Sequence, residues 1–270
     1  MKSIASLLKI EFIKTYHYKS FRVLGLVYIV TLLLVFVGIQ GFLSNLTVNV
    51  NNQSPASAEW FPVYSFPGVW QNFTYIAGYL KIFPAFIIIF LITNEFTYQT
   101  LRQQLITGLS RIDYLKGKIM LIAIFSVAIA LIIAIAGLVA GVLQPSPNYG
   151  AILNRGLWFI PIHAFELFTY LTFAALMAIL LKRAGIAVII FILYVWIIER
   201  IIGLILPGSL DRFLPMKAVG NLIPVPNSPI MKLFGMQFSE QTAATDLLTS
   251  LVYIIVFITS MFLLLRNRDV

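Results

Sequence analysis

Six long apolar runs constrain the fold of this chain more than any other feature of its sequence. Each run approaches the ~20 residues that an α-helix, rising ~1.5 Å per residue, needs to cross ~30 Å of bilayer hydrocarbon. The runs are continuously apolar rather than alternating, which favours helices over a membrane barrel. They cover residues 21–43, 73–93, 119–143, 157–181, 186–206 and 247–265. We therefore predict a single all-α transmembrane domain over residues 1–270, with six transmembrane helices.

Composition excludes several other classes of protein. Hydrophobic residues make up 60% of the chain and charged residues 11%, against ~25% charged residues in an average soluble domain. No small-residue cleavage site follows the first apolar run, so we expect this run to remain as a membrane anchor. The chain has no cysteine, which excludes disulfide frameworks, thiolate metal sites and iron–sulfur clusters.

The distribution of basic residues predicts the orientation, because membrane proteins retain Lys and Arg in their cytoplasmic segments. With the N-terminus in the cytoplasm, most of the 19 basic residues fall on cytoplasmic segments, namely Lys2, Lys9, Lys14, Lys19, Arg22, Arg102, Arg111, Lys116, Lys118, Lys182, Arg183, Arg266 and Arg268. The net charge of +9 then reflects this bias and implies a lipid bilayer, not a nucleic acid, as partner. We predict a multi-pass protein of a bacterial cytoplasmic (inner) membrane, with both termini in the cytoplasm.

Two segments outside the runs have features of interfacial structure. Near the N-terminus, apolar residues recur every fourth position (Ile4, Leu8, Phe12, Tyr16) while lysines lie elsewhere, which predicts a helix lying along the cytoplasmic surface. A basic tail that extends the first span is the alternative. Residues 207–246 contain five prolines and several apolar patches. We expect an outer interfacial or re-entrant segment there, between the fifth and sixth spans.

The loop between the second and third runs contains signals for a defined structure. Residues 97–107 are mostly polar but place Leu101 and Leu105 one turn apart, which predicts a short helix. Gly108 is suited to end that helix in a left-handed conformation. Ser110 followed by Asp113 forms a capping-box pattern that leads into the third span. A solvated connector is the alternative interpretation.

Small residues form a stripe along the third run. Ala130, Ala134, Gly137 and Gly141 recur at spacings of three or four, which lets another backbone approach closely. We favour packing within the chain over a subunit interface.

A few ionisable residues interrupt the apolar runs. A charge at the bilayer centre costs ~2.5–3.5 kcal/mol on insertion scales, so these residues should face protein or a wet cavity. A translocation pathway would use His163, Glu166, Glu199 and Arg200. Structural ion pairs or exposure at the outer interface remain equally open. In the second run, Lys81 lies close enough to the outer face to snorkel, and Pro84 should weaken a backbone bond and kink the helix.

The loop also resembles that of a known family. An acidic residue ends the second run, a short helix with Thr-Leu-Arg follows, and Gly-x-Ser-Arg precedes the third run; the matching positions are Glu95, Thr100, Arg102, Ser110, Arg111 and Lys118. In this order, and in its six-span plan, the chain resembles the permease (transmembrane) subunits of type-2 ATP-binding-cassette (ABC) exporters. It departs at Gln99, where many members have Gly.

The resemblance implies partners and a mechanism. The short helix would be a coupling helix that docks on a separate ABC ATPase subunit, which binds the ATP and Mg²⁺, while this chain binds no cofactor. A second permease subunit would complete the transporter. The docking region would comprise Glu95, Thr97, Tyr98, Leu101, Arg102 and Leu105. Glu95 and Arg102 could equally form an ion pair within the chain.

Catalysis by the chain itself is not expected. It has no Gly-x-x-x-x-Gly-Lys-Ser/Thr phosphate loop, since Gly117-Lys118 is followed by Ile and lacks the preceding glycine. Only two histidines occur, and no catalytic or metal-ligand pattern is visible. The alternatives to an ABC permease are a membrane-embedded enzyme and an ion-coupled transporter that uses Glu166 or Glu199. Sparse charge in the spans favours a hydrophobic or amphipathic cargo over a highly charged one.

Overall fold

The computed structural model describes residues 4–44, 64–143, 150, 155–207, 210–226 and 242–267. Within these ranges all regular elements are helical. They are α1 (Ile4–His17), α2 (Lys19–Ser44), α3 (Gly68–Leu80), α4 (Ile82–Thr97), α5 (Thr100–Ile106), α6 (Arg111–Val142), η3 (Arg155–Trp158), α7 (Phe159–Leu181), α8 (Ala184–Leu193), the π-helical turn η4 (Tyr194–Ile198), α9 (Glu199–Ile205), η5 (Asp211–Phe213), α10 (Pro215–Gly220) and α12 (Ala244–Asn267).

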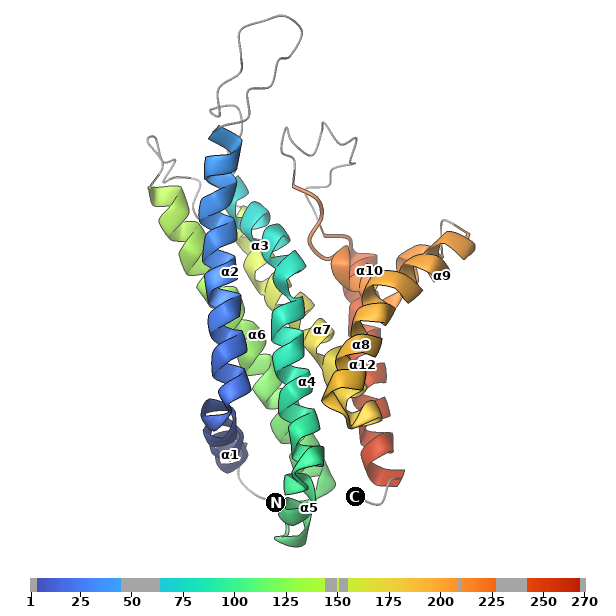
Figure 1. Cartoon of the computed structure of the whole chain (residues 1–270). Coiled ribbons are helices and arrows are strands. Elements are labelled where there is room, and N and C mark those ends of the chain that lie inside the picture. Colours follow the sequence, from blue (N-terminus) through green and yellow to red (C-terminus); the bar gives the residue numbers. More distant parts are fainter. Residues whose placement is uncertain are drawn as a thin grey trace, which may run out of the picture.

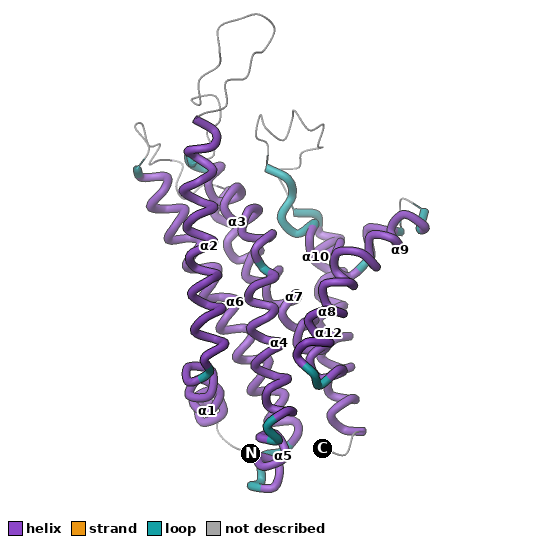
Figure 2. The backbone as a smooth tube through the Cα atoms, viewed as in Figure 1, coloured by secondary structure: helices purple, strands orange, loops and turns teal. Residues whose placement is uncertain are grey.

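The helices form an elongated bundle around α7 (Figure 1). Helix α7 packs against α4, α6 and α12. In the most apolar stretch of the span Gly156–Leu181, which contains α7, 61% of the residues are buried, against 11% in that of the span Ala184–Ile205. Figure 2 shows α8 and α9 as an arm that diverges from the bundle. Helices α1 and α5 and the last turn of α12 lie at the same end of the bundle (Figure 1). We call this the terminal end.

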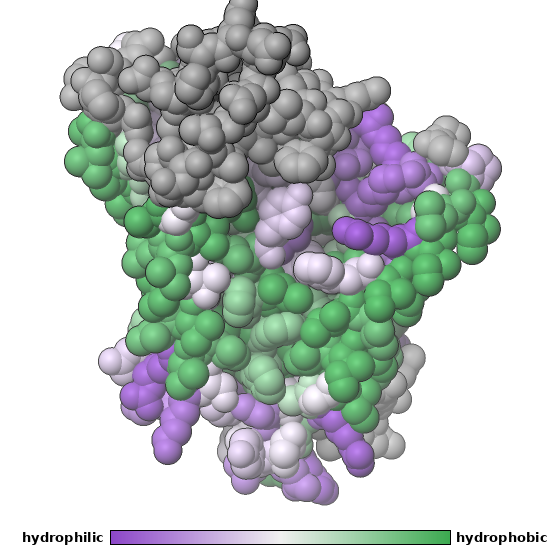
Figure 3. Space-filling view, turned by 45° about the horizontal axis from the view of Figure 1, so that its top comes forward, coloured by the Kyte–Doolittle hydropathy of each residue, from purple (hydrophilic) through white to green (hydrophobic). Residues whose placement is uncertain are grey.

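Five helices are long and apolar enough to cross a membrane, and the bent pair α3–α4 makes a sixth candidate span. The chain is therefore a multi-pass, all-helical protein within the described residues, as predicted. Hydrophobic residues cover the middle of the face in Figure 3, and hydrophilic residues gather toward its lower end. This banding is what a bilayer environment requires of the surface.

The second span is broken, whereas we predicted one helix over residues 73–93. Helices α3 and α4 meet at Lys81 with a bend of 45°. The cause is Pro84, which has no N–H to donate to the carbonyl of Leu80 four residues earlier. Helical bonding resumes with the N–H of Ala85, which donates to the carbonyl of Lys81 at 3.2 Å. The kink predicted from Pro84 is confirmed.

The predicted helix over residues 97–107 is also divided. Helix α4 continues to Thr97, and Gln99 adopts a left-handed conformation (φ 53°) before α5 begins at Thr100. Gly108 has φ 93°, which confirms its predicted left-handed role. Ser110 caps α6 by accepting a hydrogen bond from the backbone N–H of Asp113 at 3.0 Å, so the predicted capping interaction is present.

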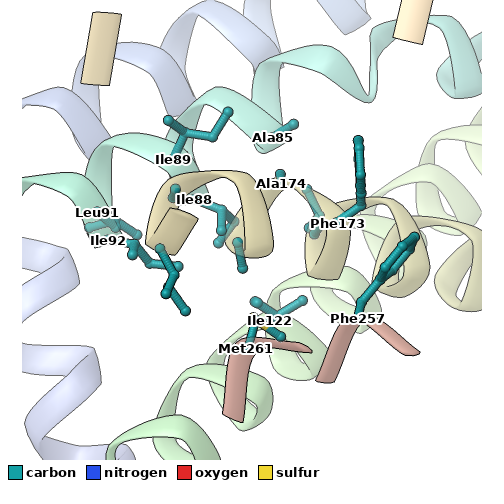
Figure 4. Packing of buried hydrophobic residues seen from close by; sticks show 14 of the residues in the cluster. Ala85, Ile88, Ile89, Leu91, Ile92, Ile122, Phe173, Ala174, Phe257 and Met261 are labelled. Carbon is teal, nitrogen blue, oxygen red and sulfur yellow. The ribbon is translucent and has the colours of Figure 1, made fainter. Parts of the chain in front are cut away.

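The core lies between α4, α7 and α12. Figure 4 shows Ile88 and Ile92 of α4 and Met261 of α12 directed toward α7. Ala174 on α7 is fully buried, and its small side chain lets neighbouring helices approach closely. The predicted outer segment contains η5 and α10, and α10 packs against α12 and α7. Residues 208–209 and 227–241 of that segment lie outside the described residues.

Candidate functional site

The connection from α4 to α6 projects at the terminal end, where several of its side chains are exposed. Four of them, Thr97, Tyr98, Arg102 and Ile106, form what we call the α5 tip. Tyr98 is 66% exposed and Ile106 is 76% exposed, which is unusual for large apolar side chains outside an apolar surface band. Beside the tip, a cavity of about 480 Å³ is lined by Arg102, Lys182 and Arg183. The tip thus combines apolar and cationic groups in one exposed place.

The residues of the docking region predicted from the sequence differ in exposure. Glu95 and Leu101 are each only 1% exposed, although both line the cavity beside the tip. Leu105 is half-buried against the main core, whereas Thr97, Tyr98 and Arg102 face outward. The prediction did not include Ile106, which is exposed and lies off the helical face that Leu101 and Leu105 share.

Directly behind the tip lies a buried group of charges, the terminal charge cluster, formed by Glu11, Lys14, Glu95, Tyr114 and Lys118. The Lys118 ammonium lies 2.6 Å from Glu11 Oε2 and 2.8 Å from Glu95 Oε1. Lys14 lies 3.1 Å from Glu95 Oε1, and the Tyr114 hydroxyl donates to Glu95 Oε2 at 2.8 Å. With two carboxylates and two ammonium groups the cluster is balanced, as burial demands.

This cluster connects α1, α4 and α6 at the base of the tip. Glu95 does form an intrachain ion pair, but its partners are Lys118 and Lys14 instead of Arg102. Glu11 was not singled out by sequence reasoning, because a single glutamate in a basic segment gives no sign of a buried partner. The arrangement fixes the position of α1 relative to the α5 tip.

Helix α1 has one face on the bundle and one face exposed. Leu7, Glu11 and Thr15 are buried, and the Glu11 side chain reaches α6. Phe12 and Tyr16, from the predicted apolar stripe, are exposed together with Ile13. An exposed apolar face of this kind is suited to the membrane interface.

In the opposite half of the bundle, Glu166 on α7 is the centre of a second buried charge group. Its Oε1 lies 2.5 Å from the Lys81 ammonium and its Oε2 lies 3.0 Å from His163 Nδ1. The Lys81 ammonium also lies 4.9 Å from the ring centroid of Tyr170. A Cβ at Gly78 would lie 3.4 Å from Glu166 Oε1, so the carboxylate packs directly against α3. Lys81 therefore pairs inside the bundle, where we had expected it to snorkel outward.

The four residues predicted for a translocation pathway have separate positions. Glu166 and Arg200 line a cavity of about 660 Å³ between α3, α7, the α8–α9 arm and α10, which we call the upper pocket. His163 is fully buried behind Glu166. Glu199 is buried as well, and its Oε1 accepts the backbone N–H of Lys217 on α10. Glu199 therefore anchors α10 beside the pocket.

Two further ion pairs lie beside the upper pocket. The guanidinium of Arg212 donates to both carboxylate oxygens of Asp246, at 2.8 and 2.9 Å. This hydrogen-bonded carboxylate raises the pKa of Arg212 above its ordinary value, so the guanidinium stays charged. Lys217 pairs with Asp211. Across the described residues, no group of three or more His, Asp or Glu side chains is placed to hold a metal ion.

The small residues of the third span lie against α3 and the segment before it. A Cβ at Gly137 would lie 3.1 Å from Phe73, and one at Gly141 would overlap the ring of Phe66. Ala130 is buried and Ala134 is half-buried in the same region. Absence of side chains at the two glycines therefore makes room for aromatic rings of the same chain.

Comparison with known protein families assigns the chain to a family. The model of the ABC-2 family transporter proteins matches residues 7–198. This range includes most of α1, the α5 tip, both buried charge groups and the helices up to η4. No curated protein matches the sequence significantly. The chain therefore belongs to the ABC-2 family of transporter proteins and is a multi-pass membrane permease of the kind that works with an ABC ATPase subunit.

Proposed function

We propose that this permease exports a substrate across the cytoplasmic membrane of a bacterium, powered by ATP that a separate ATPase subunit hydrolyses. The terminal end is the cytoplasmic end, and the α5 tip is the surface that docks on the ATPase. Two permease subunits and two ATPase subunits form the transporter. ATP and Mg²⁺ bind to the ATPase, and this chain performs no catalysis itself.

The observation that carries the proposal is the exposed α5 tip on its buried, charge-paired base. Tyr98 and Ile106 supply an apolar centre and Arg102 supplies a charged rim, which is the composition of a protein contact. The Lys118 ion pairs behind the tip join α1, α4 and α6. A displacement of the tip would therefore move α1, α4 and α6 together. Such a concerted movement is what would couple closure of the ATPase subunits to motion of the permease.

The orientation is supported by the placement of exposed cations. Lys9, Lys19, Arg22, Lys116 and Arg183 are all exposed and belong to segments near the terminal end. Basic residues of this kind are retained on the cytoplasmic side of membranes. Placing the terminal end in the cytoplasm also gives the α5 tip access to ATP-dependent partners.

Co-purification tests the docking role with two isoleucines from the same end of the chain. Ile106 is in the tip, whereas Ile112 is 48% exposed on the first turn of α6. Ile106→Asp should abolish co-purification of a phosphate-loop ATPase with the full-length permease, and Ile112→Asp should leave it unchanged. Equal retention of the ATPase by both variants would exclude the tip as the docking surface.

An ion-coupled transporter is less well supported. Such a mechanism needs a membrane carboxylate that binds and releases a cation or proton. Glu166 is held by Lys81 and His163, and Glu199 accepts a backbone N–H of α10. Both carboxylates thus have structural partners. Substrate transport that persists after ATP depletion but stops when the proton gradient is collapsed would favour the ion-coupled alternative.

A further inference from the structure

The upper pocket is lined by several charged side chains. Four cationic side chains line it, Lys81, Arg200, Arg212 and Lys217, together with two carboxylates, Glu166 and Asp246. Cations therefore outnumber carboxylates among the lining residues, although Lys217 is also paired with Asp211 next to the pocket. With a volume of about 660 Å³, the pocket is within the ~300–1,000 Å³ range of small-molecule sites.

The accessible charge in the pocket is cationic. The side chains of Glu166 and Asp246 are only 3% and 6% exposed, whereas those of Arg212 and Lys217 are 41% and 45% exposed. The carboxylates are thus covered by their partners, and the cations face outward. Each cation keeps unused N–H donors, since an ammonium has three and a guanidinium five.

Arg200 is the cation with the most freedom to bind a ligand. It is exposed at the start of α9 and, among the residues that the structure describes, it has no ion-pair partner. Figure 3 shows hydrophilic surface next to the hydrophobic arm at the right of the view. A free guanidinium beside an apolar arm suits a ligand that has both an anionic and an apolar part.

The apolar part has its own surface in the same pocket. Tyr79 and Trp196 line the cavity and are both more than half exposed. Tyr75 and Tyr170 contribute further aromatic surface. Large amphipathic rings next to cations form a site with one apolar and one charged side.

We propose that the upper pocket binds an amphipathic anion, with its phosphate or carboxylate head on Arg200, Arg212 and Lys217 and its apolar portion against Trp196 and Tyr79. The anion is either the headgroup of a membrane lipid or a soluble amphiphile. The site belongs to the permease alone, so it binds its ligand whether or not the α5 tip docks an ATPase.

Native mass spectrometry of the full-length permease in a neutral detergent tests the site, with dodecyl phosphate as the probe and dodecanol as its uncharged match. Arg200→Gln should weaken the binding of dodecyl phosphate by about tenfold or more, because a hydrogen bond to a charged group is worth ~1.5–3 kcal/mol. Arg22→Gln removes an exposed arginine at the other end and should leave the affinity unchanged. Equal binding of dodecanol and dodecyl phosphate, or an unchanged affinity of Arg200→Gln, would overturn the proposal.

A second variant keeps the test decisive if Arg200→Gln impairs folding. Trp196→Ala should weaken the binding of dodecyl phosphate, because the alkyl chain loses its aromatic surface. The thermal unfolding midpoint of both variants, measured without ligand, should equal that of the wild type. If Arg200→Gln lowers the midpoint, Trp196→Ala decides alone, and an unchanged dodecyl phosphate affinity in that variant refutes the site.

Competition then distinguishes the two sources of the ligand. If phosphatidylglycerol displaces dodecyl phosphate and phosphatidylcholine does not, the site takes an anionic lipid headgroup. If neither lipid displaces the probe, the site takes a soluble amphipathic anion. Both results support the proposal, and displacement by phosphatidylcholine as effective as that by phosphatidylglycerol counts against it.

Discussion

The Lys118 ammonium on α6 lies 2.8 Å from the carboxylate of Glu95 at the end of α4, and 2.6 Å from that of Glu11 on α1. One buried cation thereby holds together three helices that are far apart in sequence. Breaking a buried ion pair on one side is strongly destabilising, because it leaves an uncompensated charge in the interior. The position of the α5 tip relative to α1 therefore depends on this lysine.

Replacing Lys118 by Met should destabilise the protein by about 3–5 kcal/mol, because Glu11 loses its interhelix cation and Glu95 keeps only the partly exposed Lys14. The thermal unfolding midpoint of the purified protein in detergent measures the effect. Lys116→Met is the matched control, since Lys116 is exposed on the same turn, and its midpoint should stay unchanged.

The same cluster allows a rescue experiment. Combining Lys118→Met with Glu11→Gln and Glu95→Gln removes the three most buried charges together and leaves only Lys14, whose side chain is 22% exposed. The triple variant should therefore recover most of the stability lost by Lys118→Met. A triple variant less stable than the single one would show that the charges stabilise the fold by another route.

Gly141→Ala should destabilise the bundle by about 1–3 kcal/mol, the usual cost of overpacking. The added Cβ would overlap the Phe66 ring, so the ring or the helix must move. Gly25→Ala on α2 meets no atom within 4 Å and serves as control. Equal thermal midpoints for the two variants would contradict the close approach of Phe66 to α6.

Pro84→Ala should straighten the second span, because an alanine at this position has a backbone N–H that can donate to the Leu80 carbonyl. The chain has no cysteine, so spin labels on cysteines introduced at Gly68 and Thr97 report only this span. Removing the 45° bend should lengthen the distance between the labels by roughly 3 Å, given a helix rise of ~1.5 Å per residue. An unchanged distance would mean that tertiary packing, rather than Pro84, maintains the bend.

The sequence predicted the helices because bilayer-length apolar runs leave few alternatives. It also predicted local features that depend on neighbouring residues, such as the Ser110 cap and the left-handed Gly108. It placed the start of the loop helix wrongly, because the turn uses a left-handed Gln99, a conformation that glutamine seldom adopts. The residue itself does not mark a helix break, and the only sign was the glycine that many members of the resembled family have at this position.

Pairings between distant residues could not be predicted in the same way. Glu11 and Lys118 are 107 residues apart, and their contact depends on how α1 packs against α6. Lys81 gave a similar difficulty, because its pairing with Glu166 depends on how α3 and α4 pack against α7. Burial of Glu95 depends on the same tertiary packing, because its partners lie on α1 and α6.

Site-specific photocrosslinking in native membranes tests the central claim, that the α5 tip is the docking surface for an ABC ATPase. A photoreactive maleimide on a cysteine at position 106 should crosslink to a protein with a Gly-x-x-x-x-Gly-Lys-Ser/Thr phosphate loop, whereas the same label at position 112 should not. Identification of the crosslinked protein by mass spectrometry supplies the result. A correctly folded permease whose label at position 106 reaches no such ATPase, under conditions where substrate transport proceeds, would contradict the account.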